Sequence, residues 1–221
     1  MQSWRGQIRN RDHDLSGGRL HTVIPVSDVK TSGVLLRERG RFVFCYGPHA
    51  SGGVYVYRIG GHREPNESPW ACAAREAREE ATAVVRQLAS GLSVQTDGAH
   101  GNIRRLKWPA VVAGHIGEPE RPLVVGGSLE PGSDRSTLFL AETSDECHPS
   151  DEAYGLVRLT PGQVIETVRS PGSFSSIEDD AEPQDPHSGT LGDRPIVLSS
   201  HLRALAFCLE RGYIPEQAAG L

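Results

Sequence analysis

The sequence predicts a mixed α/β domain of the α+β type, with short strands on both sides of one early helix and further helices near the end. β-branched and aromatic residues gather in short runs separated by Gly, Pro and Ser, which is typical of strands and turns. An Ala-rich stretch follows Ser68 and Pro69, and an amphipathic stretch ends at Gly212, which is typical of capped helices. This order of elements is typical of a mixed domain.

Length, charge and cysteine spacing limit the class of protein. The chain has 221 residues, so we expect a polar N-terminal segment over residues 1–20 and a single domain over 21–221. The net charge of −5 argues against binding of a nucleic acid polymer through bulk electrostatics. The apolar runs are too short to cross a membrane, and residues 1–15 lack the apolar core of a signal peptide. The four cysteines are scattered without a C-x-x-C pair, so we expect reduced thiols and a cytoplasmic location.

Four strands are expected before the early helix, with a hairpin turn at residues 38–40 between the second and the third. The runs are HTVIPV (21–26), GVLLRE (33–38), RFVFCYG (41–47) and VYVYRI (54–59). Ser68 caps the helix, Pro69 suits its first position, and the Ala-rich sequence favours helix through the eighties.

Further strands and two more helices are expected after the early helix. The strand runs are WPAVVAGHIG (108–117), RPLVVGG (121–127), STLFLAE (136–142) and the start of GLVRLTPGQVIETVR (155–169), which continues as a helix from Pro161. Residues 170–194 are rich in Ser, Pro, Asp and Gly and predict a mobile loop or lid. A C-terminal helix is expected over residues 199–211.

Three carboxylates share a narrow arc of the early helix. Glu76, Glu79 and Glu80 are three and four residues apart, and like charges at such spacings destabilise a helix by some tenths of a kcal/mol per pair. A divalent cation such as Mg²⁺ or Mn²⁺ would remove that repulsion, because hard cations prefer oxygen ligands. On the helix alone, a solvated face paired with Arg75 and Arg78 is the better interpretation.

The spacing of residues around the helix favours a cation site over a solvated charged face. Gly61 is followed after five residues by Glu67 and after seven more by REAREEATA (75–83). This pattern resembles the signature of the Nudix hydrolases, with every glycine and charged position through Glu80 in register. Thr82 stands where the family usually has Gly, which puts the exit from the helix in doubt. The motif covers about a tenth of the chain.

The resemblance implies an α/β/α sandwich with a mixed central sheet, and an enzyme that cleaves a nucleoside diphosphate linked to another group. Water would attack phosphorus while metal ions neutralise the charge on the phosphoryl oxygens. By position, Glu76, Glu79 and Glu80 would hold Mg²⁺ or Mn²⁺ with the carbonyl of Gly61. One of these glutamates would orient or deprotonate the water, and the motif leaves open which one.

The resemblance also implies supporting roles. Arg75 would orient a glutamate through a charge-assisted hydrogen bond, and Glu67 would brace the loop against the helix. Family members often add a carboxylate from a later loop, and we favour Glu152 because it just precedes the strand at residue 155. The other candidates are Glu142, Asp145, Glu146 and Asp151.

The sequence leaves the substrate open among nucleotide sugars, ADP-ribose and modified nucleoside triphosphates. Arg58, on the strand that leads into the motif, is the best single candidate for contact with a substrate phosphate. Two alternatives stay open: a nucleotide sensor without turnover, for which Thr82 leaves room, and an enzyme that acts on a non-nucleotide diphosphate. We expect a small-molecule diphosphate as partner, with no nucleic acid polymer and no membrane, and a homodimer remains open.

Overall fold

The computed structural model describes residues 12–14, 20–97, 102–113, 119–150, 152–185 and 191–214, and for 12–14 the backbone alone. The helices are α1 (Pro69–Ala81), α2 (Pro161–Arg169) and α3 (Ser200–Glu210), with 3-10 turns η1 (Val26–Asp28), η2 (Phe174–Ser176) and η3 (Glu178–Asp180). The strands are β1 (Asp12–Asp14), β2 (Leu20–Pro25), β3 (Val29–Glu38), β4 (Arg41–Pro48), β5 (Val54–Tyr57), β6 (Ile59–His62), β7 (Arg86–Gln87), β8 (Val94–Thr96), β9 (Ile103–Arg105), β10 (Ala110–Ala113), β11 (Val124–Gly126), β12 (Arg135–Thr143), β13 (Gly155–Leu159), β14 (Ala181–Pro183) and β15 (Ile196–Leu198).

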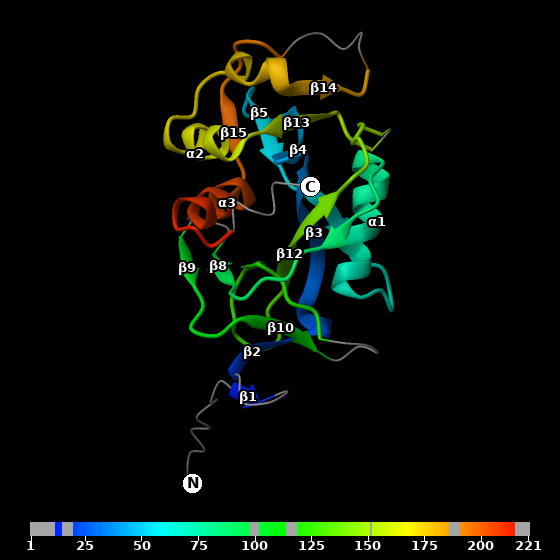
Figure 1. Cartoon of the computed structure of the whole chain (residues 1–221), viewed down its shortest axis with the longest axis vertical. Coiled ribbons are helices and arrows are strands. Elements are labelled where there is room, and N and C mark those ends of the chain that lie inside the picture. The colour runs from blue at the N-terminus through cyan, green and yellow to red at the C-terminus, as the bar shows by residue number, and fades with distance from the viewer. Residues whose placement is uncertain are drawn as a thin grey trace.

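Strand β3 is the centre of a curled mixed sheet. It pairs antiparallel with β4 and β6 and parallel with β12. From β4 the sheet continues through β13 to β14, and from β12 through β11 and β8 to β9. Helix α1 covers one side of this sheet, while α2 and α3 lie on the other (Figure 1). The mixed α/β/α architecture predicted from the sequence is confirmed.

The two faces of the sheet build two separate cores, because successive side chains of a strand point to opposite faces. On β3, Val34 and Leu36 belong to the cluster under α1, whereas Leu35 belongs to the cluster under α2 and α3. On β4, Cys45 belongs to the cluster under α1, and Phe44 belongs to the cluster under α2 and α3. Both helical layers therefore depend on the alternation within the same two strands.

A second, small sheet lies at one end of the molecule. Strand β2 pairs antiparallel with β1 and parallel with β10. Beneath it lies a third apolar cluster that includes Ile24, Val112 and Val125. The N-terminal segment was expected to be irregular, but Asp12–Asp14 forms a strand within it.

The predicted strands are present, with narrower bounds in places. The hairpin turn is confirmed: Glu38 pairs with Arg41, and both Arg39 and Gly40 have positive φ angles, 47° and 81°. The expected strand at residues 108–117 is shorter, because β10 ends at Ala113, and residues 114–117 lie outside the described part. The short strands β7, β8 and β9 have no counterpart in the sequence-based prediction.

Helix α1 begins as predicted and ends earlier than predicted. The Ser68 side chain accepts a hydrogen bond of 3.1 Å from the amide of Ala71, and Pro69 is the first helical residue. The helix stops at Ala81, so the expectation that it continues through the eighties is wrong. Thr82 takes the left-handed conformation, with φ of 52° and ψ of 23°, as a glycine would at a helix end.

The segment expected to be a mobile loop, residues 170–194, contains η2, η3 and β14 where it is described. Its apolar residues are buried: Phe174 is 1% exposed, Ile177 4% and Leu191 6%. These three residues anchor the segment to the main core cluster. Its mobility stays a prediction, and residues 186–190 lie outside the described part.

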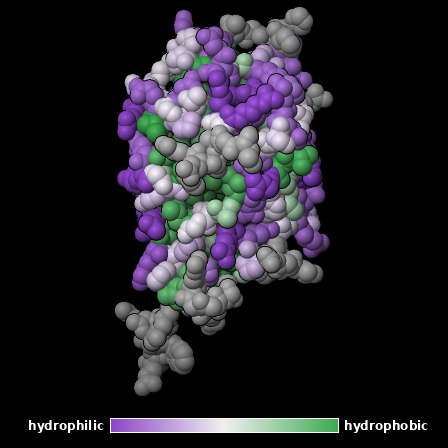
Figure 2. Space-filling view, in the orientation of Figure 1, coloured by the Kyte–Doolittle hydropathy of each residue, from purple (hydrophilic) through white to green (hydrophobic). Residues whose placement is uncertain are grey.

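The surface in view is largely hydrophilic at its edges, with hydrophobic side chains gathered nearer the middle (Figure 2). Val84, just past the end of α1, is a large hydrophobic residue with 60% exposure. Within the described ranges, no helix combines the length and the apolar character that crossing a membrane requires.

Candidate functional site

Small residues bring α1 close to strands β3 and β6. Ala73, Ala77 and Ala81 are fully buried on the face of α1 that packs on the sheet. Alanine side chains keep the helix axis close to the strands, so residues that flank this face are buried too. Glu76 and Glu80 flank it and are only 8% and 9% exposed.

Two glycines of β6 make room for these two carboxylates. The amide of Gly60 donates a hydrogen bond of 2.6 Å to Oε2 of Glu80. A Cβ atom added to Gly61 would lie 2.4 Å from Oε1 of Glu76, which is closer than real contacts allow. Gly60 also has a φ of 146°, which residues with a side chain rarely adopt. The junction between β6 and α1 thus requires glycine at both positions.

Arg75 joins the carboxylates to one another. Its Nη1 lies 2.5 Å from Oε2 of Glu79 and 2.9 Å from Oε1 of Glu76. Its Nε donates to Oε1 of Glu67 at 3.0 Å, and its Nη2 donates to the carbonyl of His62 at 3.0 Å. These hydrogen bonds, first of all the one to Glu67, raise the pKa of Arg75.

Glu67 ties the loop before α1 to the helix. Its Oε2 accepts a hydrogen bond of 3.0 Å from the amide of Glu64, while its other oxygen accepts from Arg75. Burial alone would raise the pKa of Glu67, but the hydrogen bonds from Arg75 and Glu64 outweigh it and leave the pKa below its usual value. The side chain therefore stays ionised and connects two segments of the chain.

Burial makes Glu80 and Glu76 reluctant to ionise. Burial raises the pKa of Glu80 to about 7; the Gly60 amide and Arg58 oppose this, whereas the charge of Glu76 adds to it. Burial also raises the pKa of Glu76, against the opposing charge of Arg75. Close, partly desolvated carboxylates of this kind are typical of functional sites.

A loop between β12 and β13 is bonded to the C-terminal end of α1. The His148 amide donates to the carbonyl of Ala81 at 3.1 Å, and the Ser150 hydroxyl donates to the carbonyl of Glu79. The Thr82 hydroxyl donates to the His148 carbonyl at 3.3 Å and accepts from the His148 amide at 3.2 Å. Carbonyls that a helix end leaves open are thus satisfied by this loop.

The same loop brings one of the expected distal carboxylates within electrostatic reach. The charge of Glu152 contributes to the raised pKa of Glu80, after burial and Glu76. Three other candidates are engaged elsewhere: Glu142 pairs with Arg86, Asp145 accepts from the amide of Val84, and Glu146 pairs with Arg39. Asp151 lies outside the described residues.

Arg58 lies beside the carboxylates and is largely buried. A Cβ atom on Gly60 would lie 2.4 Å from its Nη1, and its Nε has no hydrogen-bond partner within the described ranges. Burial lowers the pKa of Arg58, while Glu80 opposes that shift. Burial, and then the charge of Arg58, lower the pKa of His201 on α3 to about 3.

Comparison with known families decides the identity of this arrangement. A sequence model described as the NUDIX domain matches residues 19–108, which include α1 and every position of the motif. Residues 19–108 of the chain form a NUDIX domain. The match supports an enzyme of the Nudix hydrolase type, acting on phosphoanhydrides.

Solved structures similar to the chain include other Nudix proteins. A NUDIX hydrolase from Nitrosomonas europaea is 21% identical with a TM-score of 0.37, and the match covers 61% of this chain and 58% of that one. An Ap4A hydrolase from C. elegans is 14% identical with a TM-score of 0.39, covering 62% and 84%. A possible asymmetric diadenosine tetraphosphate hydrolase from Jonesia denitrificans is 10% identical with a TM-score of 0.47, covering 90% and 98%. A comparison with curated proteins found no match.

The Nudix carboxylates have the chemistry to hold a hard cation, but Arg75 engages two of them here. As the side chains stand, no three His, Cys, Asp or Glu side chains in the described part of the chain could jointly hold a metal ion. Arg75 contacts Glu76 and Glu79, and Glu80 accepts from the Gly60 amide. The donor set of three carboxylates and a carbonyl still fits a divalent cation, because all the donors are oxygen.

Sequence reasoning did not identify several neighbours of the Nudix motif. Gly60 could have been noticed, because it precedes Gly61 directly. Ser150 and His148 carry no local signal, since they meet α1 only through the fold. His201 seemed one of several dispersed histidines, and only the packing of α3 brings it near Arg58.

Proposed function

We propose that this Nudix protein is a pyrophosphohydrolase that depends on a divalent cation and cleaves a nucleoside diphosphate linked to another group. The observation that carries the proposal is the junction of β6 and α1. There the carboxylate of Glu76 occupies the space next to Gly61 that any other residue would fill, and Glu80 accepts from the Gly60 amide. Such close packing of ionisable groups against backbone has no benefit for stability, because burial of carboxylates costs free energy.

Glu76, Glu79 and Glu80 would hold the cation, Mg²⁺ or Mn²⁺, together with the Gly61 carbonyl. The cation would supply positive charge to the phosphoryl oxygens as water attacks phosphorus. Arg75 positions the glutamates, since its guanidinium already contacts Glu76 and Glu79. A glutamate with a raised pKa, such as Glu80, can also accept a proton from water near neutral pH.

Glu67 and Glu152 would act at the edges of this site. Glu67 braces the preceding loop through Arg75, and it also accepts a hydrogen bond from the amide of Glu64. Glu152 pairs with no cation in the described part of the chain, and its charge reaches Glu80. This freedom supports it as the carboxylate contributed by the later loop.

Arg58 would contact a substrate phosphate, since a buried guanidinium needs a partner for its free Nε. It lies close to Glu80, where the cation would bring phosphate oxygens.

The geometry at the end of α1 supports an enzyme rather than a nucleotide sensor without turnover. Thr82 was the position that left room for a non-catalytic protein, and it takes the left-handed conformation that the usual glycine would take. The exit geometry of the helix is thus kept, and the carboxylate set is complete.

The four cysteines support the cytoplasmic location expected from the sequence. Cys45, Cys72, Cys147 and Cys208 are all free and buried. Unpaired thiols are typical of proteins in a reducing compartment.

A screen of diphosphate compounds with Mg²⁺ and Mn²⁺ tests the proposed function. It should include nucleotide sugars, ADP-ribose, modified nucleoside triphosphates, dinucleoside polyphosphates and isoprenoid diphosphates, with released phosphate and monophosphates as the readout. Turnover of a nucleoside diphosphate derivative supports the proposal. Turnover of the isoprenoid compounds alone would replace it with the non-nucleotide alternative. Full turnover in excess chelator would contradict the role of the cation.

A further inference from the structure

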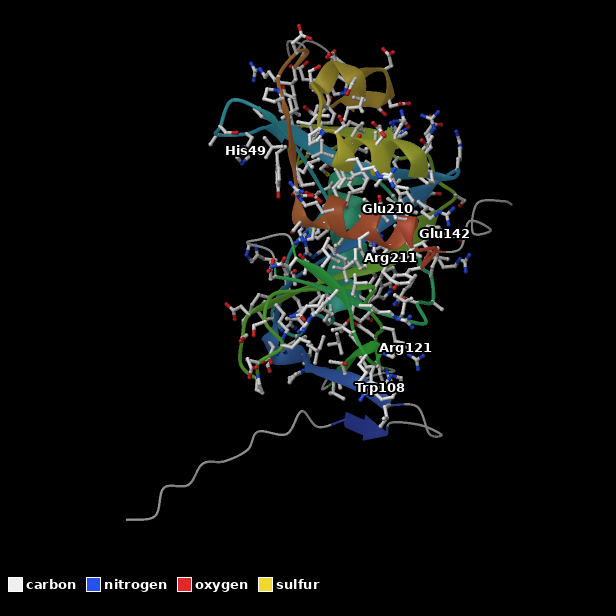
Figure 3. The ribbon with its side chains drawn as sticks, turned by 90° about the vertical axis from the view of Figure 1, so that its left-hand side faces the viewer. His49, Trp108, Arg121, Glu142, Glu210 and Arg211 are labelled. Atoms are coloured by element: carbon white, nitrogen blue, oxygen red, sulfur yellow. The ribbon has the colours of Figure 1, made fainter. Side chains whose placement is uncertain are left out.

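A cavity of about 400 Å³ lies outside the Nudix motif, where β2 approaches the residues that follow β9. None of the residues that line it belongs to the motif. Figure 3 shows Trp108 and Arg121, which both line it, close together near β2 at the lower end of the molecule. The volume falls within the range of roughly 300–1,000 Å³ that is ordinary for small-molecule sites.

The lining of this cavity is positively charged, although the chain has more acidic than basic residues. Arg105, Lys107 and Arg121 line it, and no carboxylate among the described residues does so. None of the three cations forms an ion pair within the described ranges. Arg105 lies over the ring of Tyr213 at 5.4 Å, and Lys107 lies over the ring of Trp108 at 5.2 Å. Cations gathered without a counter-charge repel one another, and an anion in the cavity would relieve that repulsion.

Two buried nitrogen atoms of the lining also lack partners. His21 is 3% exposed, and its Nδ1 has no hydrogen-bond partner in the described part of the chain. The indole nitrogen of Trp108 is buried and equally without a partner there. Buried polar groups are normally hydrogen-bonded, and an indole N–H can only donate. A covered donor without an acceptor therefore lies in the wall of the cavity, beside three exposed cations.

We propose that this cavity is a second binding site, for a small phosphorylated molecule that carries a planar ring, of the nucleoside monophosphate class. A phosphate group offers several strong acceptor oxygens and up to two negative charges, which suits the three exposed cations of the lining. Trp108, Leu20 and Pro109 supply an aromatic and apolar wall for the ring. The site is separate from the Nudix carboxylates, because the two sets share no residue.

Indole signals in a ¹H–¹⁵N spectrum test the proposal, with AMP, adenosine and inorganic phosphate as probes in excess chelator. The chain has three tryptophans, and Trp108→Phe assigns the signal of Trp108. AMP should shift that signal with saturation, while adenosine and phosphate should bind at least about tenfold more weakly. Trp70 lies on α1 and reports on the other site, so its signal should stay unchanged.

Arg121→Gln is the decisive variant, because the Arg121 side chain is exposed and forms no hydrogen bond, ion pair or ring contact in the described part of the chain, so the variant should fold like the parent. It should weaken AMP binding about tenfold or more, as the loss of a charge-assisted contact would. Arg203→Gln, on the exposed face of α3, is the matched control and should bind AMP like the parent. The proposal is overturned if the Trp108 signal does not move, if Trp70 moves instead, if adenosine or phosphate binds as tightly as AMP, or if Arg121→Gln has no effect.

Discussion

Glu80 is subject to two opposing effects. Burial disfavours its charge and raises its pKa to about 7, while the Gly60 amide and Arg58 favour its charge. The net cost shows that this carboxylate is not placed for the stability of the metal-free protein. A nearby cation would reverse the balance, because it favours the charged form.

Replacing Glu80 by Gln keeps the size of the side chain and an oxygen that can accept from the Gly60 amide. If Glu80 holds a cation, turnover should fall by at least about 100-fold, because the transition state loses a fixed positive charge. Steady-state kinetics on the substrate found in the screen measure this loss. Glu64→Gln is the control, since its exposed side chain makes no contact with the site, and it should match the parent. Equal rates for Glu80→Gln and the parent would show that the catalytic assignment of α1 is mistaken.

The same residue predicts how the stability of the metal-free protein depends on pH. Glu80 has a higher pKa folded than unfolded, so its contribution to stability is full below pH 4.5 and is lost as pH rises through about 7. One pKa unit corresponds to about 1.4 kcal/mol, so a rise from 4.5 to about 7 sets the loss at no more than roughly 3–4 kcal/mol. Denaturant unfolding in chelator at pH 5 and pH 8 should show a smaller decline for Glu80→Gln than for the parent. Parallel declines in the two proteins would contradict this.

At the scale of elements, the end of α1 and the loop before β13 behave as one unit. Thr82 adopts the left-handed conformation, which β-branched residues normally disfavour. Its hydroxyl both donates a hydrogen bond to the backbone of His148 and accepts one from it. Ser150 adds further bonds to the last turn of the helix. Glu152 lies two residues further on, and its amide donates a hydrogen bond of 3.4 Å to the Ser150 hydroxyl.

Replacing Thr82 by Val should therefore be harmful in two ways. The β-branched strain remains, while both hydrogen bonds to His148 are lost, so the free energy of unfolding should fall by about 1–2 kcal/mol. Turnover should fall as well, because Glu152 loses part of its support. Thr82→Gly removes the bonds and the strain together, and thermal unfolding should place it between Val and the parent. A Val variant as stable as the parent would show that the hydroxyl contributes nothing.

The sequence predicts elements whose causes are local and misses those whose causes are distant. The cap at Ser68, the turn at Arg39 and Gly40, and the spacing of the three glutamates follow from neighbouring residues, and each could be read directly. The loop bonded to α1 could not, because Thr82 and His148 are 66 residues apart. The anchoring of the 170–194 segment has a distant cause as well: Phe174 looks isolated in a polar stretch, yet it packs against Tyr46 with ring centroids 4.8 Å apart.

At the scale of the whole molecule, a divalent cation should stabilise the fold. A ligand that binds the folded state alone stabilises it by about 2.7 kcal/mol at a concentration 100 times its Kd. Thermal unfolding should therefore shift upward with millimolar Mg²⁺ or Mn²⁺ and return to the starting value in excess chelator. The shift should be smaller in Glu80→Gln. A shift of equal size in that variant would place the cation elsewhere.

The bonds between α1 and the later loop also have a consequence for the order of events during synthesis. The carbonyls of Glu79 and Ala81 find their partners only at Ser150 and His148, so they stay exposed to water while β7 to β12 leave the ribosome. Contacts that join distant parts of a chain form late, because a long loop must close first. A nascent chain that stops before residue 148 would hold the Nudix motif on a helix with a frayed end, and the glutamates would gain their final spacing only after the loop arrives.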